Sequence, residues 1–231
     1  MDYIIEPPKT PSVAVNGSDA RFPVRRIFCV GRNYEAHARE MGADPTREPP
    51  FFFTKPADAV VDSEQSIPYP AETANLHYEA ELVVAIGKGG FRIREADAAD
   101  HIFGYAVGND LTRRDLQFVA REAGRPWDWG KAFDRSALCA PIHAISDTGE
   151  MTAGEIKLSV NGETKQRSDV SLLIWSVREI ISILSCSMEL KPGDLIYTGT
   201  PEGVGPIGVG DTMVASIVGL TDLVTHIGEP V

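Results

Sequence analysis

Residues 76–84, LHYEAELVV, place two carboxylates inside an apolar stretch, and this pairing constrains the fold more than any other feature of the chain. The apolar residues that follow, Leu82 to Val84 and Ile86, predict a half-buried β-strand. Glu79 and Glu81 are two residues apart, so on a strand their side chains point to the same face. Neighbouring carboxylates repel each other, and burying either is costly unless a positive charge compensates it. The fold must therefore bring a cation to this face or leave the face in solvent.

A hard divalent cation is the simplest partner for two carboxylates on one face, because such ions prefer oxygen ligands. Asp110, at the end of the predicted strand 103–112, offers a third carboxylate. Three such ligands would leave an ion like Mg²⁺ with positions for water and substrate. The alternative for Glu79 and Glu81 is a solvated strand face. His77 shares the predicted face and is a ligand, a neighbour of the ligands or a surface residue.

Two further clusters carry candidate chemistry. His37 and Glu40 are three residues apart, so they are neighbours on one face of a predicted short helix. A carboxylate beside an imidazole fixes its tautomer and raises its basicity, as a general base requires, although many such pairs only decorate a surface. Arg32, Arg114 and Lys131 supply the local positive charge that an anionic substrate needs, with surface salt bridges as the alternative.

The charge balance excludes some classes of function. The chain has 22 Lys and Arg against 33 Asp and Glu, a net charge of −11, which argues against nucleic-acid binding. Any anion must then be held locally. The lack of a long apolar run and of a signal-peptide pattern predicts a cytoplasmic protein without membrane contact. Cys29, Cys139 and Cys186 have apolar neighbours and are predicted to be buried free thiols.

The predicted strands are short and outnumber the helices. Strands are predicted at 25–31, 49–56, 103–112, 194–199, 211–219 and 222–228, a hairpin at 156–167 around Asn161-Gly162, and helices at 33–42, 95–102, 113–124 and 171–188. These elements do not alternate regularly, which favours an α+β domain with much mixed or antiparallel sheet. Residues 1–24, rich in Pro and polar residues, are predicted to be a lead-in to a single domain over 25–231. The GxGxxG match at 203–208 is rejected as a dinucleotide site, because a strand pattern follows it where a helix is required.

Taken together, these motifs resemble the fumarylacetoacetate hydrolase superfamily, and in particular its acylpyruvate hydrolase branch. The matching segments are CVGRNYEAHAREM, FFFTKP, LHYEAELVV, NDLTRRDLQ, WDWGKAFD, LSVNGE and IYTGTPEGVGP, in family order over roughly residues 25–219. HxExE, DxTxRD and TGTPxGVG together are far more specific than any one motif. The resemblance implies a mixed β-roll with peripheral helices, assembled as a homodimer.

The resemblance also implies a role for each candidate residue. Glu79, Glu81 and Asp110 would bind Mg²⁺ or Mn²⁺, while His37 and Glu40 would activate water from a helix that closes over the substrate. Lys131 would lie near the reacting oxygens. Substrate binding would fall to four residues: Arg32, Arg114, Gln117 and Thr200. The segment after Gly42, ADPTREPP, has a composition that suits a mobile lid.

The implied reaction is metal-dependent hydrolysis of the C–C bond of an acylpyruvate, a 2,4-dioxo acid, with fumarylpyruvate giving fumarate and pyruvate. The alternatives at the same metal site are oxaloacetate decarboxylation, which needs no activated water, and isomerisation of a dienoate diacid. An alternative of another class is a non-catalytic homologue that binds a metal or a ligand.

Overall fold

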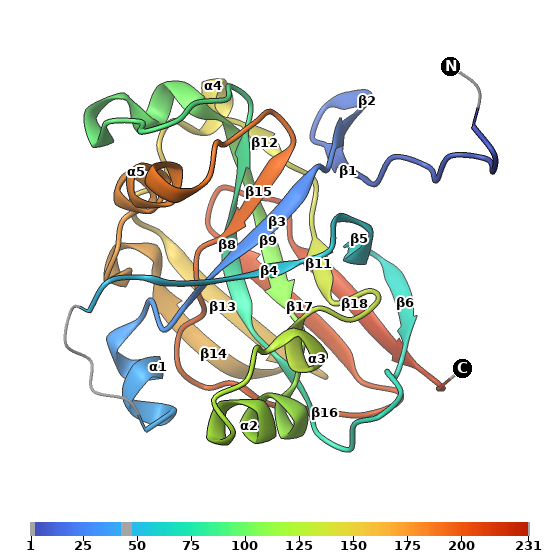
Figure 1. Ribbon diagram of the computed structural model, residues 1–231. Helices are drawn as coiled ribbons and strands as arrows, with labels where there is room; N and C mark the ends of the chain where they lie inside the picture. Colours follow the sequence, from blue (N-terminus) through green and yellow to red (C-terminus); the bar gives the residue numbers. More distant parts are fainter. Residues whose placement is uncertain (1–2, 43–47, 231) are drawn as a thin grey trace.

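The computed structural model describes residues 3–42 and 48–230, and strands dominate it (Figure 1). The strands are β1 (Ser12–Val15), β2 (Ser18–Pro23), β3 (Arg26–Gly31), β4 (Phe51–Lys55), β5 (Val60–Asp62), β6 (Gln65–Pro68), β7 (Leu76–Tyr78), β8 (Ala80–Ile86), β9 (Ile102–Asp110), β10 (Thr112–Arg113), β11 (Ala137–Cys139), β12 (His143–Ala144), β13 (Glu155–Val160), β14 (Glu163–Asp169), β15 (Asp194–Tyr197), β16 (Gly205–Ile207), β17 (Thr212–Ile217) and β18 (Leu223–Gly228). The helices are α1 (Glu35–Glu40), α2 (Arg114–Glu122), α3 (Asp128–Lys131), α4 (Ile145–Thr148) and α5 (Val177–Ser187), with 3₁₀ turns at Ala57–Ala59, Glu95–His101 and Val170–Leu172. Most of the predicted lid segment, 43–47, lies outside the described residues.

The two largest sheets of the fold are mixed, and two smaller ones have the orders β1-β2 and β10-β7-β16. Of the mixed sheets, the larger has the order β4-β3-β15-β8-β9-β11-β5, with β12 also pairing with β9, and the smaller has the order β14-β13-β17-β18-β6. Most pairs are antiparallel, but β3 with β15, β5 with β11 and β6 with β18 are parallel. Apolar residues of β8, β9, β13 and β17 meet in one core, and the helices lie at the periphery (Figure 1). This confirms the α+β mixed β-roll predicted for the chain.

Strand β8 is buried on both faces, so the prediction of a half-buried strand was wrong. Leu82 and Val84 pack into the larger core. Val83 faces the other way, into a second core that also contains Val13 and Phe22. These two residues come from the β1–β2 hairpin, which forms within the predicted lead-in. The second face of β8 is therefore covered partly by a segment that showed no strong strand signal.

Helix α2 buries its polar side. In the sequence of the predicted helix 113–124, Leu116, Val119 and Ala120 fall at helical spacing and predict an apolar stripe that faces the core. Arg114 and Gln117 are 2% and 4% exposed, whereas Val119 is 60% exposed. Only Ala120 of the predicted stripe is buried. The usual rule fails here because this helix covers a charged pocket, described below, and does not lie on the apolar core.

Other local predictions had mixed outcomes. The turn at Asn161-Gly162 is confirmed, with φ of 51° and 83°, the two positive values of a type I′ hairpin. Strand β16 within 203–208 confirms the rejection of the dinucleotide motif. The long helix begins at Val177 and not at 171, because Ser176 and Glu179 form a capping box that sets its start. Cys29 and Cys139 are buried as predicted, but Cys186 is exposed on α5, so its predicted burial was wrong.

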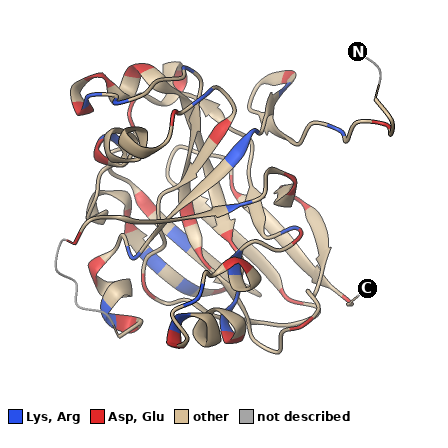
Figure 2. Cartoon of the chain, viewed as in Figure 1, with Lys and Arg blue, Asp and Glu red and all other residues tan. Residues whose placement is uncertain are grey.

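Charged residues are interspersed over the chain. Figure 2 shows residues of both positive and negative charge on α1 and on α2.

Within the described ranges, we find no helix with the length and hydropathy needed to span a membrane.

Candidate active site

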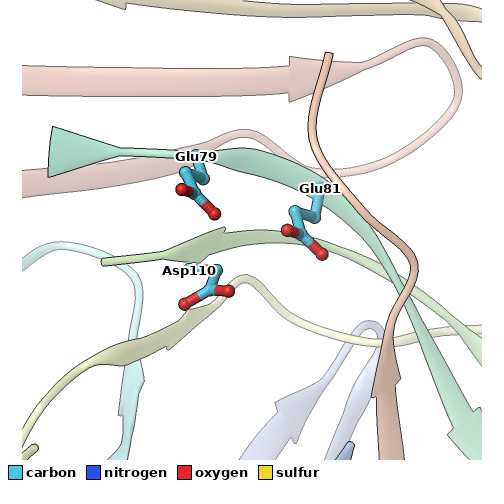
Figure 3. A group of neighbouring side chains, drawn as sticks. All are labelled: Glu79, Glu81 and Asp110. Atoms are coloured by element: carbon cyan, nitrogen blue, oxygen red, sulfur yellow. The ribbon is translucent and has the colours of Figure 1, made fainter. Parts of the chain in front are cut away.

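The three predicted carboxylates meet at the point where two strands come together. The chain interrupts its strand at Glu79, between β7 and β8, and the Glu79 amide donates to Asn109 Oδ1 at 2.8 Å. The Asp110 amide in turn donates to the Glu79 carbonyl at 2.9 Å, which fixes the end of β9 beside this break. One oxygen from each of Glu79, Glu81 and Asp110 lies within 4.8 Å of the others, and Figure 3 shows the three side chains pointing toward one another.

Three cationic side chains of the protein pair with this acidic cluster. Lys131 Nζ lies 2.6 Å from Glu79 Oε2 and 2.8 Å from Asp110 Oδ2, and Arg114 Nη2 lies 2.5 Å from Glu79 Oε1. Lys55 Nζ lies 2.8 Å from Asp110 Oδ1 and also donates to the carbonyls of Leu111 and Lys131. Cationic side chains of the protein itself thus compensate part of the negative charge, and one of them, Lys55, was not among the residues predicted from sequence. Its only signal was a lysine between aromatic residues and a proline in FFFTKP.

The two glutamates have opposite electrostatic environments. Burial would raise the pKa of Glu79, but Lys131 and Arg114 outweigh burial and hold its pKa well below the usual range. Burial, together with the neighbouring carboxylates of Asp110 and Glu79, raises the pKa of Glu81 well above its ordinary value. Glu81 pairs with no cationic side chain in the described part of the chain; its Oε2 accepts the Gly199 amide at 2.7 Å. Glu81 is therefore the carboxylate that most needs an added cation.

The cluster fits a hard divalent ion. All of its donors are carboxylate oxygens, the ligands that Mg²⁺ and Mn²⁺ prefer. Asp110 Oδ1 is buried and has no hydrogen-bond donor, because Lys55 approaches it as an ionic neighbour outside hydrogen-bond geometry. With all six groups ionised, three carboxylates face three cations and the formal charge is zero. A divalent ion would make the cluster doubly positive, which a dianionic ligand would neutralise.

The predicted pair on α1 is formed. His37 Nδ1 lies 3.0 Å from Glu40 Oε2, and the His37 side chain is buried while Glu40 is partly exposed. Burial would raise the pKa of Glu40, but its hydrogen bonds with His37 and with the Gly203 amide lower it. An ionised Glu40 holds the proton of the imidazole on Nδ1, so Nε2 is left as the acceptor.

Backbone amides of the loop after β15 donate hydrogen bonds to two of the predicted glutamates, Glu81 and Glu40. Gly199 donates to Glu81, and Gly203 donates to Glu40 at 3.0 Å. Gly199 has a φ of 105°, and a Cβ there would lie 2.7 Å from Asn33 Cβ, so glycine is required. These contacts could not be predicted from sequence, because a backbone amide leaves no side-chain signal.

Arg114 is held from several sides. Besides Glu79, it donates through Nη1 to Gln117 Oε1 at 2.5 Å and through Nε to His77 Nδ1 at 3.4 Å. His77 Nε2 bonds to Asn75 Oδ1 at 2.9 Å, and burial followed by the charge of Arg114 lowers the pKa of His77 to about 4. His77 is thus a neutral neighbour of the acidic cluster that orients Arg114, one of the alternatives that the sequence left open.

One pocket brings the predicted residues together. It is lined by eight of them: Arg32, His37, Glu79, Glu81, Arg114, Gln117, Lys131 and Thr200. The other two do not line the pocket but are hydrogen-bonded to residues that do: Glu40 to His37, and Asp110 to Lys131. Phe53 and Trp127 form an aromatic wall, with ring centroids 5.8 Å apart and Lys131 Nζ 5.0 Å from the Phe53 ring.

Two residues that line the pocket, Thr200 and Arg32, have groups available to bind a ligand. Gln166 Nε2 donates to Thr200 Oγ1 at 2.8 Å, so the Thr200 hydroxyl keeps its own proton to donate. Arg32 has a φ of 59°, a left-handed conformation that costs free energy for a residue with a side chain. Its guanidinium lines the pocket without an ion pair to any described carboxylate. Strain at a pocket residue is typical of functional sites.

Comparison with known proteins gives a consistent result. Residues 26–228 match the family model described as fumarylacetoacetate (FAA) hydrolase C-terminal. The chain is 49% identical over 185 residues to a fumarylpyruvate hydrolase of Ralstonia, covering 80% of this chain and 96% of that protein. It is 39% identical over 199 residues to an oxaloacetate tautomerase of Escherichia coli, covering 86% and 90%. A crystal structure of fumarylpyruvate hydrolase from Pseudomonas aeruginosa with Mn²⁺ and pyruvate superposes with a TM-score of 0.96 at 54% identity, covering 99% of this chain and 100% of that one.

Proposed function

Because this chain belongs to the fumarylacetoacetate hydrolase family, we propose that it hydrolyses the C–C bond of an acylpyruvate, converting fumarylpyruvate to fumarate and pyruvate. The observation that carries the proposal is that one pocket joins a buried acidic cluster with a His37–Glu40 pair. Relatives named fumarylpyruvate hydrolase are about half identical to this chain, and one of them was solved with Mn²⁺ and pyruvate.

The metal site in this proposal consists of Glu79, Glu81 and Asp110. When bound there, Mg²⁺ or Mn²⁺ would act as a Lewis acid toward the keto oxygens of the substrate. The positive charge that the cluster then carries matches a dianionic dioxo acid, which the overall charge of −11 would repel.

Water activation falls to His37. With the proton on Nδ1 held by Glu40, Nε2 removes a proton from water, whose oxygen attacks the acyl carbonyl carbon, C4 of the substrate. The C3–C4 bond then breaks, its electron pair passes to C3, and His37 returns the proton there. One water is consumed, and one carboxylic acid and one pyruvate are formed.

The remaining side chains stabilise charge and orient the substrate. Two protons of Lys131 Nζ point to Glu79 and Asp110, and the third is free to donate to the developing oxyanion at C4. Gln117 accepts from Arg114 through Oε1, so its amide group is left to donate to the substrate, as is the Thr200 hydroxyl. Arg32 adds a cation that pairs with no described protein carboxylate.

A second candidate reaction is tautomerisation of oxaloacetate. Proteins named oxaloacetate tautomerase from Escherichia coli and Homo sapiens are 39% identical over 86% and 89% of this chain. That reaction shifts a proton and adds no water to the carbon skeleton. A panel assay with Mg²⁺ separates the candidates: fumarylpyruvate, acetylpyruvate, fumarylacetoacetate and oxaloacetate are offered, and products are identified. We expect hydrolysis of fumarylpyruvate with the highest kcat/KM. Turnover of oxaloacetate alone would reject the hydrolase proposal.

We further propose that the protein is a cytoplasmic homodimer that takes part in the breakdown of aromatic compounds, as the family resemblance implies. Val119 and Trp129 are 60% and 80% exposed beside an apolar groove between α2 and α3, and such exposed patches are typical of interfaces. Light scattering should give twice the chain mass of 25.1 kDa, and a single-chain mass at micromolar concentration would contradict the dimer.

A further inference from the structure

Arg121 lies on the pocket side of α2, at its outer end. Arg114, Gln117 and Arg121 are spaced by three and four residues, so they lie along one helix face, and all three line the pocket. Arg114 and Gln117 are buried next to the acidic cluster, whereas Arg121 is exposed. Seven residues of helix separate Arg121 from Arg114 by about 10.5 Å along the axis. Arg114 therefore lies at the buried end of the pocket lining, and Arg121 lies at its exposed end.

The guanidinium of Arg121 is held in place without being neutralised. Its Nη1 donates to the Met41 carbonyl at 3.0 Å, at the end of α1. A guanidinium has five N–H donors, and no carboxylate of the described residues pairs with this one. One edge thus stays available for a planar, bidentate contact with a carboxylate. Arg121 is therefore an oriented cation at the pocket mouth that pairs with no carboxylate of residues 3–42 and 48–230, and it can bind a carboxylate of the substrate.

We propose that Arg121 binds the carboxylate at the far end of the acyl group and so selects diacid acylpyruvates over uncharged ones. This inference rests on the proposed hydrolysis of fumarylpyruvate. In that reaction the dioxo end of the substrate lies at the acidic cluster, and the whole seven-carbon chain of extended fumarylpyruvate has a length comparable with the axial separation of Arg114 from Arg121. The aromatic wall of Phe53 and Trp127 flanks the apolar middle of such a chain.

The competing explanation is purely structural, since the contact with Met41 could serve only to fix α1, which carries His37. The two explanations differ in what the substrate must carry. A structural role affects every acylpyruvate equally, because all of them need the helix in place. A binding role affects fumarylpyruvate and spares acetylpyruvate, which ends in a methyl group.

The test compares R121Q and R121K with R92Q, a matched control that removes the same charge from an exposed arginine that lines neither this pocket nor the groove between α2 and α3. Steady-state kcat and KM are measured with Mg²⁺ for fumarylpyruvate and for acetylpyruvate. We expect R121Q to lower kcat/KM for fumarylpyruvate about 10-fold or more, mainly through KM, which is the loss expected for a charge-assisted hydrogen bond. The ratio of fumarylpyruvate to acetylpyruvate kcat/KM should fall nearly as much. R121K should lie between, because lysine keeps the charge but lacks the planar fork.

Each of the following outcomes overturns the inference. Equal losses for both substrates in R121Q would assign Arg121 to the support of α1. Unchanged kcat/KM for both substrates in R121Q, or an equal change of the ratio in R92Q, would remove Arg121 from substrate selection. If the wild-type protein hydrolyses acetylpyruvate but not fumarylpyruvate, acylpyruvate hydrolysis stands and the selection of diacids is refuted. If it hydrolyses neither, the proposed function fails, and this inference fails with it.

Discussion

The pairing of His37 with Glu40 leads to a prediction about how the two residues depend on each other. If His37 is the base and Glu40 only orients it, Glu40 has no effect once the imidazole is gone. Replacing His37 by Ala should lower fumarylpyruvate hydrolysis by about 10²-fold or more, the usual loss of a general base. Glu40→Gln keeps the size of the side chain but removes its charge.

The magnitude for Glu40→Gln follows from its contacts. Glu40 accepts two hydrogen bonds of 3.0 Å, from His37 and from the Gly203 amide. Hydrogen bonds to a charged group contribute about 1.5–3 kcal/mol. The Glu40 side chain is 34% exposed, so solvent screening favours the lower end. A loss of about 1.5 kcal/mol corresponds to a factor of about 10 in rate.

The assay is a double-mutant cycle on kcat/KM, with pyruvate release followed at saturating Mg²⁺. The double variant should be no slower than His37→Ala alone, because residues that act as a unit are not additive. Glu35→Gln is a matched control on the same helix, since Glu35 is 60% exposed and pairs only with Arg39 among the described residues. Its rate should stay within about 2-fold. Losses that multiply in the double variant would refute the orienting role of Glu40.

Three further predictions concern the acidic cluster. Chelation should abolish hydrolysis and Mg²⁺ should restore it, while Asp110→Asn should stay inactive at any Mg²⁺ concentration; full activity under chelator would reject a metal role. Lys55→Met should lower the free energy of unfolding by about 3 kcal/mol in urea titrations, because Asp110 and two carbonyls lose a buried partner. The control Lys191→Met, at an exposed lysine, should change it by about 0.5 kcal/mol or less, and similar losses in both variants would contradict this account. Glu81 is protonated below its raised pKa and must lose that proton to bind metal, so the affinity for Mg²⁺ should rise with pH. Calorimetry in buffers of different ionisation enthalpy should detect the released proton, and an affinity that does not change with pH, without proton release, would show that Glu81 is already ionised.

The meeting of Glu79, Glu81 and Asp110 could be predicted from sequence, because alternation along a strand and the position of a strand end constrain where side chains point. The prediction was right for a partly different reason. The chain leaves its strand at Glu79, and the orientation of this residue depends on the Asn109 side chain and the Asp110 amide. No periodic pattern contains such a contact.

Two other features could not be predicted, for physical reasons. The amphipathic rule assumes that the buried side of a helix is apolar, yet α2 buries Arg114 and Gln117 because its neighbours are carboxylates distant in sequence. The amides of Gly199 and Gly203 act through the backbone, where sequence shows only that glycine is present. Long-range pairing and backbone donors therefore account for most of what the sequence did not reveal.

The central claim, that this protein adds water across the C–C bond of an acylpyruvate, is tested most directly by product analysis in ¹⁸O-labelled water. With fumarylpyruvate and Mg²⁺, we predict equal amounts of fumarate and pyruvate, with one labelled oxygen entering a carboxylate of fumarate. Consumption of oxaloacetate by the same preparation, with no fumarate released from fumarylpyruvate, would contradict the claim and assign the site to proton transfer alone.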